Sequence, residues 1–505
     1  SIRTNGKSDG SINLTGEAQS DRGTDEITMV LTGALPLALK PDAKSAAVIG
    51  IGTGLTTHTL LQSLDIERVE TVEIESAMVE AARGFSPRNS AAFADPRGTI
   101  RIDDAKSYFA SRNRRYDIII SEPSNPWVSG VSSLFTREFY HHIRKHLAPG
   151  GILVQWFQLY EIDPALVASV MRALGEQFPH YAIYAPSDHD LLIVAGDAPL
   201  PAAPQARVFE HPGLAKELWK VHILSAGDLD ARYLGNRATL EPLFESYGAR
   251  ANSDYDPVLD LNAARHRFTE RSATDIVALL NAPVAVLELL EPGFARRPMN
   301  PQHKGAYSFE RIENARRAAY ARDFLLLAVP PAPLDIPTDL QKDLEVVKLR
   351  LLECRDAREL DVWLHSLLRI AELVNPSLPA ADAGVLWTRI ASAPCVRSLH
   401  EFQRRWIALF QAEGARDARA MADIGAALLG DSQNLGVLAR EHLLMAAMSG
   451  AVAAGRPNEA AALWAAQATH LQHDAAQPMF RLLRCHARPG AGEACAEAFR
   501  PYAQD

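Results

Sequence analysis

Residues 45–57 (SAAVIGIGTGLTT) limit what this chain can fold into more than any other stretch. Residues 46–49 are small or β-branched and apolar, which predicts a buried strand, and residues 55–64 continue with helical spacing. Three glycines separate these segments: Gly50, Gly52 and Gly54. A strand, a glycine turn and a helix N-terminus favour a nucleotide site, because glycine lets the backbone approach the ligand and helix N–H groups face it. Such a turn also occurs without any ligand, so this stretch alone does not identify one.

Acidic residues follow three further predicted strands. The second strand, 69–74, carries Glu73 near its end, 19 residues after Gly54, where a carboxylate can accept both ribose hydroxyls. The third strand, 99–102, precedes Asp103 and Asp104, and the fourth, 116–121, precedes Glu122. Carboxylates at successive strand ends beside a glycine turn favour a nucleoside site over the alternative of solvated loop acids.

Several motifs between residues 1 and 197 carry a family resemblance. They are RTNGKSDG (3–10), LPL (35–37), the glycine turn, VEIE (72–75), DDA (103–105), ISEPSNPW (120–127) and SLFTREFY (133–140). Through them the chain resembles the spermidine synthase (aminopropyltransferase) family, in particular bacterial spermidine-synthase-like proteins often fused behind a membrane transporter-like region. The resemblance implies an α/β fold with a class I methyltransferase-like, Rossmann-type sheet. It also implies transfer of an aminopropyl group from decarboxylated S-adenosylmethionine to an amine, with release of methylthioadenosine.

The resemblance also assigns roles to individual residues. Glu73 would bind the ribose, Asp104 the adenine amino group, and Glu122 would be the catalytic carboxylate that deprotonates or orients the amine. The remaining donor-binding positions would be Gly50, Gly52, Thr53, Gly54, Asp103 and Ser121. On the substrate side we expect Trp127, Gln155 and Asp188, with Asn125 as a second catalytic position.

Four positions depart from the family pattern. Thr53 stands where the family usually has an aspartate, which suits an ammonium and repels an α-carboxylate, so intact S-adenosylmethionine becomes a plausible donor. Asn125 replaces the second active-site aspartate and removes one charge-assisted contact to a polyamine. Met29 replaces an expected glutamine, and the tyrosine-containing loop that encloses the amine is reduced to SDHD (187–190). The donor half of the site therefore matches better than the acceptor half.

Three functions remain open at this point. The first is alkyl transfer, with Glu122 as base, of an aminopropyl group or, from intact S-adenosylmethionine, a 3-amino-3-carboxypropyl group. The second keeps the donor but methylates a substrate, or cleaves or cyclises the donor with no second substrate. The third is a non-catalytic sensor of an adenosyl compound or a polyamine.

Charge and hydropathy limit the partners. The net charge is −9, from 52 basic and 61 acidic residues with no basic block, so nucleic acid is not an expected partner. No apolar run reaches the roughly 18–20 residues that span a bilayer. The chain begins at Ser1 without a methionine, so we expect a transmembrane region upstream of it if the fused relatives are the right comparison. Because adenosyl donors are cytosolic, we expect a cytoplasmic site, with membrane tethering through that upstream region left open.

The four cysteines and the histidines give no metal motif. None of Cys354, Cys395, Cys485 and Cys495 lies in a C-x-x-C pair, and we expect free buried thiols, with a Cys485–Cys495 disulfide as the alternative. His142 and His146 have i, i+4 spacing but no third ligand nearby. We therefore expect no metal.

The chain divides into four expected segments. They are a β-hairpin layer and helix (1–40), a spermidine-synthase-like catalytic domain (41–270), a linker (271–304) and an α-helical domain (305–505). A continuous helix is predicted at 133–147, and amphipathic helices at 340–354, 359–374, 399–412 and 458–471. The NSDYDP stretch (252–257) is either a turn or a motif that closes the catalytic domain. The helical domain would serve packing, partner docking or oligomerisation, and a homodimer is left open.

Overall fold

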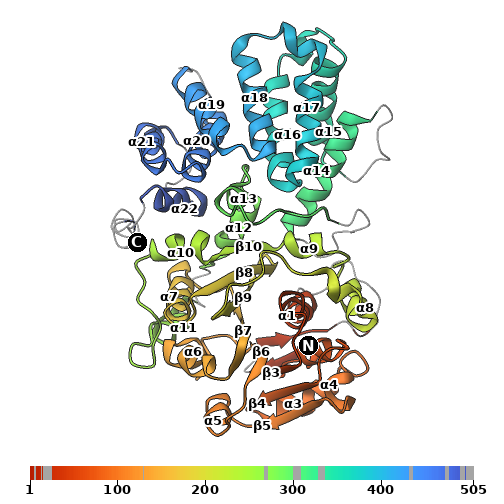
Figure 1. Ribbon diagram of the computed structural model, residues 1–505, viewed down its shortest axis with the longest axis vertical. Coiled ribbons are helices and arrows are strands. Elements are labelled where there is room, and N and C mark those ends of the chain that lie inside the picture. Colours follow the sequence, from red (N-terminus) through yellow and green to blue (C-terminus); the bar gives the residue numbers. More distant parts are fainter. Residues whose placement is uncertain are drawn as a thin grey trace. The chain divides into compact units, whose positions relative to one another are not determined.

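The computed structural model divides into two compact units, which Figure 1 shows as ribbons. Unit 1 comprises residues 1–277 and 299–309, and unit 2 comprises residues 278–298 and 310–505. The described residues are 1–4, 7–12, 14, 25–128, 130–266, 271–299, 309–327, 336–431, 436–471, 477–488 and 495. Parts of the RTNGKSDG motif, of the predicted linker (300–304) and of the ends of both predicted domains lie outside these residues.

An eight-stranded sheet forms the centre of unit 1, in the order β10-β8-β9-β7-β6-β3-β4-β5 (Figure 1). The strands are β3 (Ser45–Ile49), β4 (Arg68–Glu73), β5 (Gly98–Ile102), β6 (Tyr116–Ser121), β7 (Leu147–Gln158), β8 (His180–Ser187), β9 (Asp190–Gly196) and β10 (Tyr233–Asn236). Strands β5, β4, β3, β6 and β7 are parallel, whereas β9, β8 and β10 are added in antiparallel fashion. This order confirms the predicted class I methyltransferase-like sheet.

The strand order reverses beside β3, which pairs with β4 on one side and β6 on the other. Ligands in open α/β sheets bind at such a switch point, outside the carboxyl ends of the strands. The strands here are apolar because both faces are covered, and Val48, Ile118, Ile119 and Ile120 have no exposed surface. The site can therefore be sought where β3, β4 and β6 end.

Helices and a small hairpin surround this sheet. Helix α1 (Asp25–Leu39) packs against β7, β8 and β9, next to α2 (Leu55–Leu61) and α8 (Pro212–Lys220). The others in unit 1 are α3 (Ser76–Arg83), α4 (Ala91–Ala94), α5 (Ala105–Ala110), α6 (Arg137–Arg144), α7 (Pro164–Gly175), α9 (Ala226–Asp230), α10 (Arg237–Glu245), α11 (Val258–His266) and α12 (Asp275–Ala278). Strands β1 (Ile2–Thr4) and β2 (Lys7–Gly10) pair in a separate antiparallel sheet.

The continuous helix predicted at 133–147 is wrong. A 3₁₀ helix, η1 (Val131–Phe135), is followed by extended backbone at Thr136, with φ −95° and ψ 152°. The Thr136 side chain accepts a hydrogen bond from the Phe139 N–H and thereby caps α6. Strand β7 then begins at Leu147, inside the range that was predicted to be helical.

Unit 2 is α-helical. Its helices are α13 (Val286–Leu290), α14 (Glu310–Leu326), α15 (Thr338–Val347), α16 (Trp363–Ser377), α17 (Ala380–Ala391), α18 (Glu401–Ala415), α19 (Ala418–Asp431), α20 (Val437–Ala453), α21 (Pro457–Gln467) and α22 (Pro478–His486). Each of the four predicted amphipathic segments overlaps one of them, namely α15, α16, α18 or α21. The segment predicted as a linker instead contains α12 and α13, and α13 belongs to the helical unit.

The cysteines pair in two disulfides, so the expectation of free thiols is wrong. Cys354 is bonded to Cys395 and Cys485 to Cys495, with Cα–Cα distances of 5.1 Å and 5.5 Å. Both separations lie in the usual range for disulfides. Among the described residues no cysteine is free. The first pair joins residues 41 positions apart, which spacing in the sequence does not indicate.

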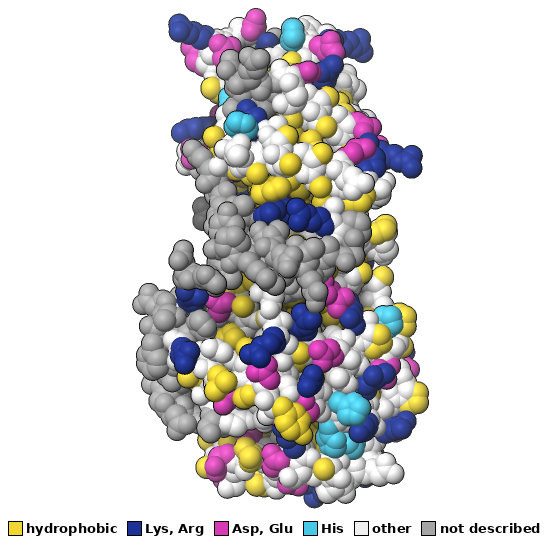
Figure 2. Space-filling model, turned by 90° about the vertical axis from the view of Figure 1, so that its left-hand side faces the viewer, with side chains coloured by type: hydrophobic (Ala, Val, Ile, Leu, Met, Phe, Trp, Pro, Cys, Tyr) yellow, Lys and Arg dark blue, Asp and Glu magenta, His cyan; other side chains and the backbone are white. Residues whose placement is uncertain are grey.

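Within the described ranges, no helix is both long and apolar enough to cross a membrane. On the face shown in Figure 2, Lys and Arg side chains lie among Asp and Glu side chains rather than gathering by sign.

Candidate active site

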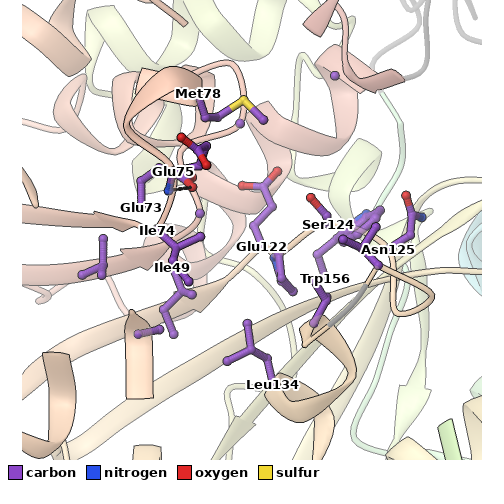
Figure 3. A pocket seen from close by; sticks show the side chains of 18 of the residues that line it. Ile49, Glu73, Ile74, Glu75, Met78, Glu122, Ser124, Asn125, Leu134 and Trp156 are labelled. Carbon is purple, nitrogen blue, oxygen red and sulfur yellow. Dashed lines mark hydrogen bonds between the residues drawn. The ribbon is translucent and has the colours of Figure 1, made fainter. Parts of the chain in front are cut away.

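A cavity of about 700 Å³ lies at the carboxyl ends of the central strands of unit 1 (Figure 3). Its walls come from the segments that follow β3, β4, β5 and β6, from α1 and η1, and from the turn between β8 and β9. The predicted residues that line it are Gly50, Gly52, Glu73, Asp103, Asp104, Glu122 and Asn125. The fold thus brings together groups that are up to 75 residues apart in the sequence.

The glycine turn gives the cavity a backbone wall. Gly50 and Gly52 adopt left-handed φ values of 90° and 46°, which L-residues with side chains rarely tolerate. A Cβ on Gly50 would collide with the carbonyl of Glu122, so this glycine allows β3 and β6 to end side by side. A Cβ on Gly52 would meet no atom within 4 Å, which leaves open backbone facing the cavity. This open backbone suits a nucleoside donor.

Two carboxylates at the same end of the cavity are fixed by backbone N–H groups. Glu73 is 8% exposed and accepts hydrogen bonds from the N–H of Ile51 and of Glu75, each at 2.9 Å. Asp104 caps α5 by accepting from the Ser107 N–H at 2.8 Å. Each carboxylate keeps further acceptor positions, so both can also accept from ribose or adenine donors.

Glu122 lies between the two ends of the cavity. In the view of Figure 3 its carboxylate is placed between the group formed by Glu73, Glu75 and Met78 and the group formed by Ser124, Asn125 and Trp156. The Thr56 hydroxyl donates to its Oε2 at 2.6 Å. Burial raises the pKa of Glu122 to about 7, and the charge of Asp190 adds to this effect while the Thr56 hydrogen bond offsets part of it. A carboxyl group with this pKa can exchange a proton near neutral pH.

Two further carboxylates, which no sequence motif indicates, line the other end of the cavity. Asp190 is 7% exposed and accepts hydrogen bonds from Thr28, Ser187 and Trp156. Asp25, at the start of α1, accepts from Ser11 at 2.8 Å. Burial raises the pKa of Asp190, and the charge of Asp25 raises it further. The SDHD stretch contains two aspartates, and the sequence does not show which of them lines the cavity. The tight turn between β8 and β9 places Asp190 there and not Asp188.

Asn125 is buried in this wall with one aromatic partner. Its Nδ2 donates to the Tyr160 hydroxyl at 3.1 Å, and Tyr160 itself lines the cavity. Trp127 packs edge-on against Tyr160, with 6.3 Å between ring centroids, but does not line the cavity itself. Trp127 therefore supports the wall from behind.

Five other predicted site residues also lie outside the cavity lining: Thr53, Gly54, Ser121, Gln155 and Asp188. Thr53 has no exposed surface, and its hydroxyl contacts the Met29 sulfur at 2.9 Å. Gln155 is fully buried and donates to the carbonyls of Ser121 and Trp156. Thr53 and Met29, two of the positions that depart from the family pattern, are thus in direct contact.

Among the described residues, no group of three or more His, Cys, Asp or Glu side chains is arranged to hold a metal ion.

Part of unit 1 is similar to known proteins. Residues 28–187 match the family model described as the Spermine/spermidine synthase domain. A polyamine aminopropyltransferase of Clostridium perfringens (strain SM101 / Type A) is 32% identical over 152 residues, which are 30% of this chain and 53% of that protein. Putrescine N-methyltransferase 2 of Nicotiana attenuata is 36% identical over 120 residues, 24% of this chain and 32% of that protein. The chain thus spans about half the length, or less, of these curated relatives.

Solved structures were matched as well. The spermidine synthase of Thermotoga maritima aligns with a TM-score of 0.31 and 24% identity, covering 34% of this chain and 60% of that one.

Proposed function

We propose that this chain transfers an alkyl group from a sulfonium donor of the S-adenosylmethionine type to an amine. The group would be aminopropyl from the decarboxylated donor, or 3-amino-3-carboxypropyl from the intact one, and methylthioadenosine would be released. The observation that carries the proposal is Glu122, a carboxylate with a pKa of about 7 between a glycine-lined end and an acidic end of one cavity. The matched synthase domain and its aminopropyltransferase relative support the same reaction class.

In this mechanism the protein mainly positions two reactants. The neutral amine nitrogen attacks the carbon next to the sulfonium, the C–S bond breaks, and its electron pair neutralises the sulfur. The new N–C bond leaves a proton on nitrogen, which Glu122 accepts. Positioning supplies much of the rate enhancement and the base supplies a further factor of about 10²–10⁴.

The residue in the glycine turn supports both the decarboxylated and the intact form of S-adenosylmethionine as donor. No carboxylate stands at position 53, and the Thr53 side chain contacts the Met29 sulfur and does not line the cavity. The repulsion that an aspartate there would exert on an α-carboxylate is therefore absent. Intact S-adenosylmethionine belongs in the first assay beside the decarboxylated form.

Methyl transfer to an amine is the second candidate, favoured by the match to putrescine N-methyltransferase 2. The two relatives' names differ in the group that is moved, but both describe enzymes with an amine acceptor. Asp25 and Asp190 support a cationic second substrate over a lyase or cyclase that has none, and over a sensor without chemistry.

The test is mass spectrometry of the nucleoside product. The protein is incubated with each donor, with and without a diamine. Methylthioadenosine that appears only with diamine supports alkyl transfer. S-adenosylhomocysteine as the product would refute alkyl transfer and support methyl transfer. Methylthioadenosine without diamine would mean a lyase or cyclase, and tight donor binding without any product would leave the sensor.

Glu122→Gln tests the base in the same assay. We expect turnover to fall about 10²- to 10⁴-fold while donor binding, followed by calorimetry, is retained. Glu67→Gln makes the same chemical change at a side chain that is 72% exposed and paired with Lys44, and should behave as the unaltered protein. Full activity of Glu122→Gln would refute the assignment of the base.

We further expect the reaction to be cytoplasmic, since such donors are made there. Size-exclusion chromatography with light scattering tests for a homodimer, and cell fractionation tests for a membrane anchor.

A further inference from the structure

Asp190 carries a negative charge into the part of the cavity where the family pattern has lost one. Position 125, an aspartate in the family, is Asn125 here, and its amide is engaged by Tyr160. Asp190 comes from a different element, the first residue of β9, after a turn that departs from the family pattern. Its side chain lines the same cavity as Asn125 and Glu122.

The hydrogen bonds of Asp190 orient it without saturating it. Thr28 and Ser187 donate to Oδ2 at 2.7 Å and 3.0 Å, and the Trp156 indole donates to Oδ1 at 3.2 Å. A carboxylate oxygen accepts about two hydrogen bonds, so Oδ1 retains capacity for one more donor. The carboxylate is therefore held in place by three donors, and its Oδ1 can accept one more hydrogen bond from a cationic group.

Two neighbours make this end of the cavity suited to a cation. Asp25 lines the cavity as well, close enough for its charge to act on Asp190. The indole of Trp156 and the ring of Tyr160 also line it, and aromatic faces attract ammonium groups. Both carboxylates attract a cationic group here and repel an anionic one.

A buried amide beside Asp190 also supports a polar ligand at this end of the cavity. Gln158 pairs directly with Asp190 across β7 and β9, so the two side chains share one face of the sheet. Gln158 has no exposed surface, and neither its oxygen nor its nitrogen has a hydrogen-bond partner in the described part of the chain. Buried amides are normally satisfied, so this one marks unused polar capacity next to Asp190.

We propose that Asp190 is the specificity-determining anion of the acceptor site, binding the second ammonium group of a diamine whose first amine lies at Glu122. Asp190 thereby takes over the contact that an aspartate at position 125 would make. This inference rests on the proposed function, because it assigns the acceptor of that same reaction. It narrows the substrate from any amine to amines with a second cationic centre.

The experiment compares two acceptors of equal length, 1,4-diaminobutane and n-butylamine, with Asp190→Asn. Loss of a hydrogen bond to a charged group should raise KM for the diamine roughly 10- to 100-fold. KM for butylamine should not change, because butylamine lacks the second ammonium group. An equal change for both amines, or none for the diamine, would overturn the proposal. Asp42→Asn, at a side chain that is 77% exposed and outside the cavity, is the matched control.

Asp190→Glu provides a second test, in which the negative charge is kept. The longer side chain should leave less room for the acceptor in the cavity that Glu122 also lines, so preference should move from 1,4-diaminobutane towards 1,3-diaminopropane. An unchanged order of preference would contradict the assignment.

Calorimetry with 1,4-diaminobutane separates this inference from the proposed reaction. If no amine is turned over but Asp190→Asn still weakens diamine binding about tenfold or more, the subsite stands and the reaction fails. If amines are turned over but Asp190→Asn binds the diamine as tightly as the unaltered protein, the reaction stands and the subsite fails.

Discussion

At the scale of single residues, the site depends on one carboxyl group with an altered proton affinity. Glu122 lies in the cavity wall, where the Thr56 hydroxyl is the one described side chain that donates a hydrogen bond to it, while the charge of Asp190 opposes its ionisation. Burial and the like charge both favour the protonated form. The same surroundings that favour a cationic acceptor therefore prepare Glu122 to accept a proton.

This arrangement predicts how activity depends on pH. A base must be ionised to accept a proton, so kcat/KM should rise as pH increases through about 7, the pKa of Glu122. In Asp190→Asn the midpoint should move to lower pH, because the opposing charge is gone. A pH profile measured with a saturating donor checks this. A midpoint near 4.5, the ordinary value for a glutamate, would contradict it.

The sequence was informative for residues that belong to contiguous motifs and not for the others. Glu73 is the last residue of a strand, and Gly50, Asp104 and Glu122 come soon after strands, and the hydrophobic pattern of these strands is clear. The parallel sheet therefore predicts that the four residues lie close together. Asp25 and Asp190 could not be found this way, because they reach the cavity through α1 and through a turn between antiparallel strands. Which side a turn residue faces is decided by tertiary packing.

At the scale of elements, the cavity wall formed by η1 is held from outside by residues 252–260. Asn252, fully buried, donates to the carbonyls of Ser132 and Phe135 and accepts from the Leu259 N–H. Ser132 in turn donates to Asp260 at 2.8 Å. The stretch that the sequence left open between a turn and a closing motif thus makes long-range bonds to the wall of the site.

Asn252→Ala should weaken both the fold and the site. It leaves two carbonyls and one N–H without this partner, which should lower the free energy of unfolding by about 2–4 kcal/mol. KM should also increase, since Val131, Ser133 and Leu134 of the same segment line the cavity. Urea unfolding and steady-state kinetics measure the two effects.

The matched control is Asn236→Ala, which removes the cap of α10 at a residue that does not line the cavity. Asn236→Ala should lower the free energy of unfolding by about 1 kcal/mol and leave KM unchanged. If Asn252→Ala behaved in the same way as this control, residues 252–260 would have no role in holding the site.

Strands and helices could be predicted where one hydrophobic pattern covered the whole element. The strand at 116–121 was located with both ends correct, because three consecutive isoleucines lie between polar residues. The helix predicted at 133–147 failed because Thr136 diverts the backbone and because residues 147–151 join β7 through pairing with β6. Hydrophobic spacing does not record such pairing.

At the scale of the whole molecule, the chain separates its cysteines from its candidate chemistry. All four cysteines belong to unit 2, and every residue that lines the cavity belongs to unit 1. The helical unit also has a buried polar network, in which His442 contacts Glu413 at 2.8 Å and Glu413 accepts from Asn375 at 2.9 Å. Covalent and polar cross-links therefore both stabilise the helical unit.

Reduction should act on the helical unit alone. Thiol titration of the denatured protein should find no free thiol before treatment with dithiothreitol and four afterwards. Each lost disulfide should cost about 2–4 kcal/mol, so thermal unfolding of the helical unit should occur at lower temperature while turnover is retained. Four free thiols in the untreated protein would show that these cysteines do not pair.

The position of Asp190 in the chain also has a consequence for synthesis on the ribosome. The glycine-lined end of the cavity needs only β3 to β6, which are complete at Ser121, whereas the acidic end waits for β9. At about 5–20 residues per second, several seconds separate the emergence of the two. A nascent chain can therefore form the glycine-lined end of its cavity before the acidic end is complete.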